Sequence, residues 1–283
     1  MRQDGVTGDH ARRAFVASRP RKYGKGRVLM SENYYSGGDH FMDPTPMPSP
    51  REFLSDFWRS FRLGIEKKSY VSGSTESEVV SQFHKLYYEL KAQTWMNTTW
   101  LGVPLTKCPL DLWIYQEILH DVRPDVIIET GTFLGGSALF LATICQIENN
   151  GRVITIDIAN RTDWPRHDRI TYLHGSSISD AIVGTVNRLI QPNDKILVVL
   201  DSDHSMHNVL RELDTYAPMV TTGSYLIVED TNINGHPVDS SSGPGPTEAI
   251  DEFLRKNDRF VRETEREKFL LTFNPGGFLK RVN

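Results

Sequence analysis

Four carboxylates occupy positions from which they could act together. Asp201 and Asp203 follow one run of apolar residues, and Glu229 and Asp230 directly follow another. If the two runs are neighbouring strands of a parallel sheet, the four side chains meet at one edge and repel one another strongly unless a cation neutralises them. An all-oxygen ligand set suits a hard cation, Mg²⁺ or Ca²⁺. We therefore predict a metal site there, although acids at strand ends can equally cap helices or face solvent.

His204 follows Asp201 by three residues and is the candidate general base of this site. An imidazole near a metal ion could collect the proton of a hydroxyl group near neutral pH. Asp201 is the second catalytic candidate, because it is either a metal ligand or a neighbour of the ligands. A surface histidine or a helix cap is the competing interpretation of His204, and His207 and His236 are weaker candidates.

A glycine-rich turn, Gly131-Thr132-Phe133-Leu134-Gly135-Gly136, follows an apolar run and leads into a predicted helix. Glycines let the chain turn sharply and let a ligand approach the backbone closely. The turn matches the pyrophosphate-binding pattern GxGxxG imperfectly, and Glu129 precedes it. An acid suits a ligand with an ammonium and a sulfonium group and would repel a pyrophosphate. The pattern favours S-adenosylmethionine over NAD, although such glycines also occur in ordinary strand-to-helix turns.

Asp157 closes the next predicted strand. A carboxylate at this place can accept hydrogen bonds from both ribose hydroxyls of an adenosine, although it could instead cap the following turn. A third strand end, at residues 175–177, would lie near the adenine. The predicted cofactor-binding residues are therefore Glu129, Gly131, Thr132, Gly135, Gly136, Ser137, Asp157, Gly175, Ser176 and Ser177.

The composition limits the class of protein. The chain has 283 residues, a net charge of −4 and 39% hydrophobic residues, which allows a sizeable core and gives no sign of nucleic-acid binding. Residues 1–27 are basic and are interpreted as a disordered tail, with an arm that touches acidic partners as the alternative. Cys108 and Cys145 are too few for a disulfide framework or a thiolate zinc site and fit a reducing cytoplasm. Because no signal sequence and no apolar run of about 18 residues is evident, we expect a cytoplasmic protein that does not span a membrane.

Hydrophobic periodicity places the elements that must position these residues. Residues 1–50 are predicted to form an arm with little regular structure, residues 51–100 a helical cap, and residues 101–283 the cofactor-binding catalytic domain. Within the cap, helical spacing occurs at 50–66 and again at 76–92. The apolar stripe of the second helix is interpreted as core and consists of Val79, Val80, Phe83, Leu86, Tyr87 and Leu90.

Short β-branched runs alternate with helices after residue 102. The runs lack polar alternation, which indicates strands covered on both faces, as in a Rossmann-like, mostly parallel α/β sheet. At the end, strand-like residues 270–273 and 278–282 flank the turn Asn274-Pro275-Gly276-Gly277 and predict an antiparallel hairpin, the edge typical of class I methyltransferases. The other predicted strands are 126–128, 153–158, 170–173, 196–200, 225–228 and 260–263, and the helices are 137–147, 182–190, 208–217 and 247–256.

The chain resembles the cephalosporin hydroxylase/rhamnosyl O-methyltransferase family over about residues 95–283. The resemblance is carried by segments 100–104, Lys107, 109–111, 115–117, 128–132, 135–137, 200–204, 228–231, 243–244 and 274–277. It implies a class I fold, S-adenosylmethionine, and Mg²⁺ held by an aspartate of the fourth strand together with Glu229 and Asp230. By the spacing of the family this aspartate is Asp203. Related small-molecule O-methyltransferases use the strand-end residue, here Asp201, and both assignments stay open.

The expected reaction is methyl transfer to a hydroxyl group of a specialised metabolite or sugar unit in natural-product biosynthesis. Positioning an activated hydroxyl in line with a sulfonium carbon supplies most of what this displacement needs. Two alternatives are the methyltransferase component of a hydroxylase/methyltransferase pair for cephalosporin-type methoxylation, and a non-catalytic partner protein that binds S-adenosylmethionine. Family members often form oligomers, so we expect a homo-oligomer. The residues expected to line the acceptor site come from the helical cap, Tyr34, Tyr35, residues 95–100 and a glycine-rich loop at 235–246, which is interpreted as a mobile lid with an ordinary surface loop as the alternative.

Overall fold

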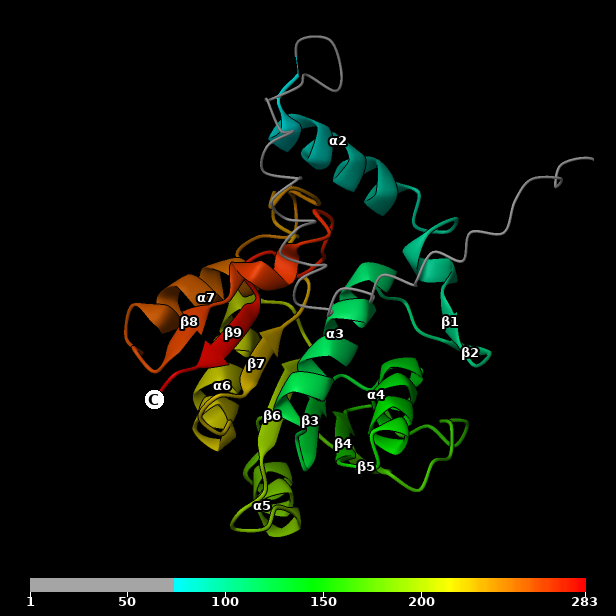
Figure 1. Cartoon of the computed structure of the whole chain (residues 1–283), viewed down its shortest axis with the longest axis vertical. Helices are drawn as coiled ribbons and strands as arrows, with labels where there is room; N and C mark the ends of the chain where they lie inside the picture. The colour runs from blue at the N-terminus through cyan, green and yellow to red at the C-terminus, as the bar shows by residue number, and fades with distance from the viewer. Residues whose placement is uncertain (1–73) are drawn as a thin grey trace, which may run out of the picture. The chain divides into compact units, whose positions relative to one another are not determined.

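A computed structural model describes residues 74–283, and Figure 1 shows how their elements are arranged. These residues belong to a unit that spans Glu66–Asn283. The predicted arm at 1–50, the predicted helix at 50–66, and Tyr34 and Tyr35 lie outside the described residues. The division into arm, cap and catalytic domain therefore stays a prediction.

The core element is a seven-stranded sheet with the strand order β5-β4-β3-β6-β7-β9-β8. The first five strands in this order are parallel, β9 is antiparallel to β7, and β8 is antiparallel to β9. This confirms the predicted α/β sheet with an antiparallel C-terminal edge. The strands are β3 (Val126–Thr130), β4 (Arg152–Asp157), β5 (Ile170–His174), β6 (Ile196–Leu200), β7 (Tyr225–Val228), β8 (Phe260–Arg262) and β9 (Phe278–Arg281).

Helices cover both faces of the sheet, as the unbroken apolar runs predict. Along β3, Val126 and Ile128 face one core and Ile127 faces the other. The first core is closed by α5 (Asp180–Leu189), α6 (Met206–Tyr216) and α7 (Pro246–Leu254), and the second by α3 (Pro109–Val122) and α4 (Gly136–Ile147) (Figure 1). No helix between residues 74 and 283 has the length and apolar character needed to cross a membrane.

The predicted strand at residues 270–273 is wrong, and the C-terminal hairpin has a different partner. The Phe273 N–H donates to Asp111 Oδ2 at 2.8 Å, and its carbonyl accepts from the Asn232 N–H at 3.1 Å. These contacts hold the backbone of Phe273 against the start of α3 and the loop after β7, so it is not available to a strand. The hairpin therefore consists of β8 and β9, with residues 263–277 as a long connection between them.

The helix α2 (Glu76–Glu89) packs against this connection through His84 and Tyr87, and only Tyr87 belongs to the predicted apolar stripe. His84 is 5% exposed, and its ring stacks on Phe273 with 5.7 Å between centroids. Asn232 Nδ2 lies 3.0 Å from His84 Nε2. Phe83 and Leu86 are more than half exposed, and Leu90 is exposed too, so their interpretation as core is wrong. After α2 come a 3-10 helix (Trp95–Asn97) and an antiparallel pair, β1 (Thr99–Trp100) and β2 (Val103–Pro104).

His84 makes the stability of this packing depend on pH. Burial lowers the pKa of His84 from 6.5 to about 4, so its contribution to stability is present above pH 6.5 and is lost as the pH falls through 4. We expect the free energy of unfolding in urea to fall by about 2 kcal/mol between pH 7 and pH 5 from this group alone. His84→Gln should remove that loss, and Phe83→Ala, on the exposed side of α2, should keep it. An unchanged pH dependence in His84→Gln would contradict the assignment.

Candidate active site

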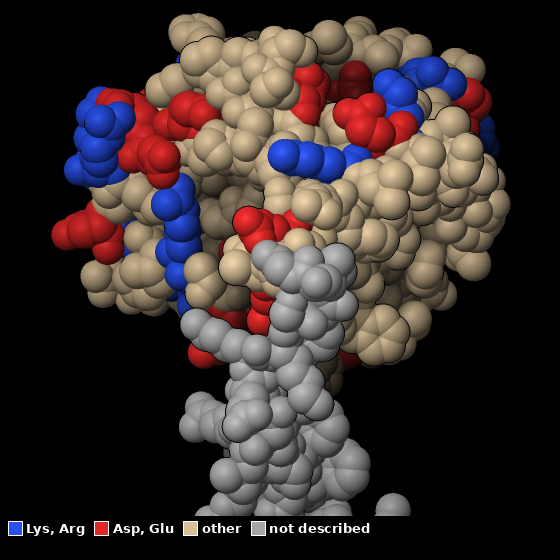
Figure 2. Space-filling model, turned by 90° about the horizontal axis from the view of Figure 1, so that it is seen from above, with Lys and Arg blue, Asp and Glu red and all other residues tan. Residues whose placement is uncertain are grey.

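A cavity of about 650 Å³ opens at the carboxyl ends of the parallel strands. This is the place where ligands bind in open α/β sheets, and the volume is in the range of small-molecule sites. Figure 2 views the molecule from this end, where acidic side chains gather around a hollow. Most of the lining residues come from the ends of β3, β4, β5, β6 and β7, from the last turn of α2 and from the segment that follows it.

Half of the predicted cofactor-binding residues line this cavity. They are Gly131, Asp157, Gly175, Ser176 and Ser177, which follow or end three successive parallel strands. The other half lie behind the lining or in the turn beside it. The cavity therefore has one side made of the predicted cofactor residues and another made of the predicted metal residues.

Asp157 combines the two interpretations that its sequence position allows. Its Oδ2 accepts from the Phe133 N–H at 2.8 Å, and its Oδ1 accepts from the Ala159 N–H at 2.7 Å. The carboxylate thus caps the turns on both sides and also faces the cavity. Because each carboxylate oxygen has a further lone pair, Asp157 can accept hydroxyl groups of a ligand without losing these contacts.

Glu129 lies fully buried behind the glycine turn. Thr155 Oγ1 donates to its Oε2 at 2.6 Å, whereas Oε1 is buried and has no hydrogen-bond partner among the described residues. Burial raises the pKa of Glu129 to about 7, although the nearby hydroxyl groups of Ser137 and Thr155 oppose the rise. A buried acceptor without a donor is costly, so this carboxyl group fits a nearby cation or proton donor. Thr132 is buried beside it, 2.7 Å from Thr155.

Gly131 is required for a reason that the sequence did not indicate. Its φ is +87°, and a Cβ atom there would lie 1.8 Å from the Asp201 carbonyl oxygen. The end of β3 thus passes directly against the end of β6. Likewise a Cβ on Gly136 would lie 2.2 Å from the Pro104 carbonyl oxygen, and one on Gly135 would lie 2.6 Å from Pro165. These glycines allow chain segments to pack closely, and only Gly131 among them lines the cavity.

Lys107 is the central cation of the acidic side. Its ammonium group lies 2.6 Å from Asp201 Oδ2 and 2.6 Å from Glu229 Oε2, and its side chain is 7% exposed. Burial disfavours the charged form, but the two carboxylates outweigh it and raise the pKa of Lys107 well above its usual value. Sequence reasoning placed Lys107 in the family resemblance without a role, because it lies far along the chain from both acids.

His204 lies between two of the predicted acids. Its Nε2 is 3.4 Å from Asp201 Oδ1, and its Nδ1 is 3.4 Å from Asp230 Oδ2. Burial lowers the pKa of His204, but the charges of Asp230 and Asp201 raise it to about 9. One ligand atom from each of the three residues lies within 4.8 Å of the others, which is a spacing that could hold a metal ion.

The remaining candidates lie outside this group of three. Asp203 is exposed at the cavity, and its Oδ1 accepts from the Ser205 N–H at 2.8 Å at the start of α6. Glu229 is 4% exposed and paired with Lys107, and its Oε1 is buried without a partner in the described part of the chain. His207 is exposed, and His236 lies 2.8 Å from Glu248. The metal itself and the aspartate that would bind it both stay predictions.

The turn at residues 274–277 sets the backbone of the β7 acids. Asp230 has a φ of +54°, which is unfavourable for a residue with a side chain. Its N–H donates to Asn274 Oδ1 at 3.0 Å, and Thr231 Oγ1 donates to the Pro275 carbonyl at 2.9 Å. A Cβ on Gly277 would lie 2.3 Å from the Val228 carbonyl oxygen. This turn was predicted as a hairpin turn, and it instead positions Asp230.

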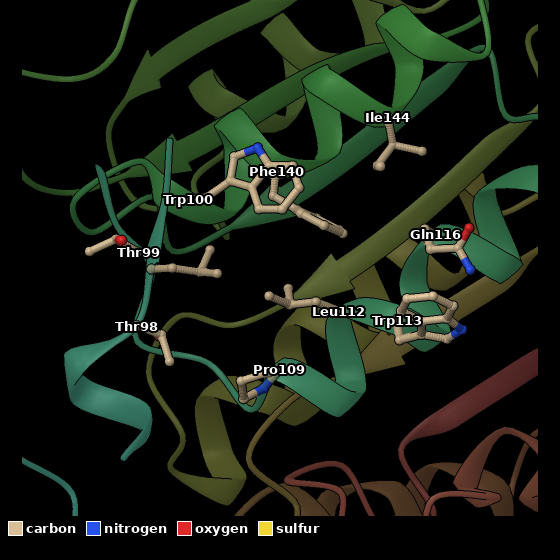
Figure 3. A pocket seen from close by; sticks show the side chains of 10 residues that line it. Thr98, Thr99, Trp100, Pro109, Leu112, Trp113, Gln116, Phe140 and Ile144 are labelled. Atoms are coloured by element: carbon tan, nitrogen blue, oxygen red, sulfur yellow. The ribbon is translucent and has the colours of Figure 1, made fainter. Parts of the chain in front are cut away.

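Two aromatic side chains from the N-terminal part of the described residues also line the cavity. Tyr88 and Trp95 line the cavity together with His204 and Asp230, and their rings stack with 5.3 Å between centroids. Trp100 was also expected to line the acceptor site, but it does not line this cavity. It lines a separate, largely apolar pocket of about 510 Å³ between α3 and α4 (Figure 3). Among the described residues, the predicted lid at 235–246 contributes nothing to the cavity wall.

Comparisons with known proteins agree on one family. Residues 92–282 match the family Rhamnosyl O-methyltransferase/CmcI. The chain is 43% identical over 211 residues to the rhamnosyl O-methyltransferase of Mycobacterium tuberculosis H37Rv, covering 72% of this chain and 85% of that protein. Its identity to the Mycobacterium leprae rhamnosyl O-methyltransferase is 40% over 209 residues, covering 72% and 90%.

Solved structures share the fold. The apo form of CmcI-N160 has a TM-score of 0.52 and 22% identity, covering 66% of this chain and 77% of that one. A CmcI-D160 structure named as a Mg–SAM complex has a TM-score of 0.50 and 19% identity, covering 66% and 78%. At these identities the likeness concerns the fold alone.

The role of the 274–277 turn in holding the backbone of Asp230 can be tested by changing Asn274. Asn274 is fully buried, and Asn274→Ala would leave the Asp230 N–H without its acceptor and the strained φ without support. We expect a loss of about 1–3 kcal/mol in the free energy of unfolding, measured in urea. The matched control is Asn257→Ala, which removes a similar acceptor for the Arg259 N–H at a half-buried position and should cost less. Equal losses of unfolding free energy in the two variants would contradict the role of Asn274 in holding the backbone of Asp230.

Proposed function

Because the chain belongs to the Rhamnosyl O-methyltransferase/CmcI family and is an S-adenosylmethionine-dependent O-methyltransferase, we propose that it methylates a hydroxyl group of a sugar unit in a specialised metabolite with the help of Mg²⁺. The observation that carries the proposal is that Asp201, His204 and Asp230 come together in the cavity that the predicted cofactor residues line. Relatives named for a rhamnosyl acceptor support the sugar, and the CmcI complex named for Mg and SAM supports the ion.

The predicted cofactor residues suit S-adenosylmethionine, which supplies a methyl group on a positively charged sulfur. Gly131, Gly175 and the two serines that follow it offer close backbone approach, and Asp157 offers lone pairs for ribose hydroxyls. The unpartnered Oε1 of Glu129 favours a cationic ligand at the end of β3. This carboxyl group would act from behind the lining, because Glu129 is fully buried.

Asp201 and Asp230 are the ligands that the geometry favours for Mg²⁺, which prefers oxygen donors and can polarise the hydroxyl group of an acceptor. Asp203 and Glu229 stay candidates from the sequence. His204 then remains free for proton transfer. In the absence of a cation, the charges of Asp230 and Asp201 hold a proton on His204, and neutralising these two carboxylates removes the cause of its raised pKa.

A sugar acceptor fits the aromatic wall of the cavity. The stacked rings of Tyr88 and Trp95 offer an apolar surface in the same cavity as Asp201 and Asp230, so the C–H face of a sugar ring could pack on the rings while a hydroxyl group faces the two carboxylates. The cluster has one histidine and two carboxylates, which is not the two-histidine, one-carboxylate set of iron oxygenases. It therefore favours methyl transfer over hydroxylation. Homo-oligomerisation and a cytoplasmic location stay predictions.

The reaction can be tested with labelled S-adenosylmethionine and a series of rhamnosides and other glycosides. We expect label in the sugar when Mg²⁺ is present, and about 100-fold slower transfer in chelator or in Asp230→Asn, because the positioned acceptor loses its polarising charge. The matched control is Asp258→Asn, which changes an exposed aspartate that does not line the cavity, and it should retain full activity. Full transfer in chelator would refute the role of the metal, and no binding of S-adenosylmethionine would refute the reaction.

The environment of His204 predicts a pH dependence in the metal-free protein. Its folded-state pKa of about 9 lies above the ordinary 6.5, so its contribution to stability is complete below pH 6.5 and is lost as the pH rises through 9. Because about a third of the side chain is accessible, we expect this loss to be only about 1–2 kcal/mol. Urea unfolding in chelator should show the decline in the unaltered protein and in His207→Gln. His204→Gln should lack it, and an identical decline in that variant would disprove the arrangement.

A further inference from the structure

Lys107 reaches the acidic edge from outside the sheet. It lies in the connection between β2 and α3, where Thr106 has a φ of +54° and the Lys107 N–H donates to Thr98 Oγ1 at 3.4 Å. The helix α3 begins two residues later at Pro109. The backbone is therefore held on both sides of Lys107, and its ammonium group lies across the ends of β6 and β7.

The charge of Lys107 acts on more than its two direct partners. Burial raises the pKa of Asp111 and of Glu129 to about 7, and the positive charge of Lys107 opposes the rise in both. It acts in the same direction on Asp230. Five buried or partly buried acids thus surround a single lysine whose charge is part of the chain.

The contacts of Lys107 also divide the roles of the two carboxylates that it joins. In Asp201, Oδ2 is taken by Lys107, so Oδ1 is the oxygen near His204. In Glu229, Oε2 is taken by Lys107, and the residue stays in the interior at 4% exposure. Removing the ammonium group would leave both acids in the same place without a counter-charge, which is more costly than removing the whole pair.

We propose that Lys107 is a built-in counter-ion, which holds Asp201 and Glu229 together before a divalent cation binds and orients Asp201 Oδ1 toward the cavity. Lys107 is in this sense a positioning residue. The inference rests on the proposed function in taking Asp201 as a ligand of the added cation. It extends that function, because the divalent cation is then needed for the reaction and not for folding.

The test compares thermal unfolding midpoints in chelator and in Mg²⁺, without cofactor or acceptor. The unaltered protein should be folded in chelator. Lys107→Met should unfold about 10 °C lower in chelator, because a buried pair has lost one partner, and Mg²⁺ should restore much of that loss by taking the place of the missing charge. The matched control is Lys268→Met, which breaks the exposed pair with Glu117. Its midpoint should change little and should not depend on Mg²⁺.

A second variant keeps the test valid if Lys107→Met does not fold. Lys107→Met combined with Glu229→Gln removes the excess negative charge together with the ammonium group, and its midpoint in chelator should return toward that of the unaltered protein. The proposal is overturned if Lys107→Met loses no stability in chelator. It is also overturned if neither Mg²⁺ nor the second substitution repairs the loss.

The outcome is separate from that of the proposed function. An unaltered protein that methylates no sugar would refute the proposed acceptor and leave these midpoints unchanged. Conversely, a Lys107→Met protein as stable as the unaltered one in chelator would refute the counter-ion and leave methyl transfer intact.

Discussion

The ammonium group of Lys107 lies between two carboxylates that would otherwise repel each other across the ends of β6 and β7. Much of the acidic edge depends on this contact. Asp201 is oriented by it, His204 is placed by Asp201 and Asp230, and the group of three that could hold a cation follows from both. The charge of Lys107 belongs to the chain and is present at any concentration of ions. It therefore allows several carboxylates to stay close together in the folded protein.

The rest of the site is assembled from segments that pack around the same edge. The turn at 274–277 sets the backbone of Asp230, and the segment before it carries Phe273, on which α2 stacks through His84. The helix α2 in turn carries Tyr88, which stacks on Trp95 at the cavity. A change in the C-terminal connection therefore reaches both the acidic edge and the aromatic wall.

Local patterns predicted much of this architecture. The unbroken apolar runs identified the parallel strands, since a strand buried on both faces needs no polar alternation. Acids that follow two such strands were correctly expected to share one edge. Predictions that relied on short patterns were less successful: the apolar stripe of α2 was assigned to the core, although Phe83 and Leu86 are exposed and His84 is buried. Residues 270–273 read as a strand because their composition does not reveal the bonds that Phe273 makes with Asp111 and Asn232.

The sequence by itself determined the sheet, the position of the cavity at its carboxyl edge, and the residue types available there. All of these follow from periodicity and chain order, which are local properties. Only the tertiary structure decided which acids face one another, because Lys107, Asp201 and Glu229 meet through contacts between distant segments. The same holds for Gly131, whose missing side chain is needed because the Asp201 carbonyl passes against it. The spacing of residues within one segment gives no information about which distant segment packs against it.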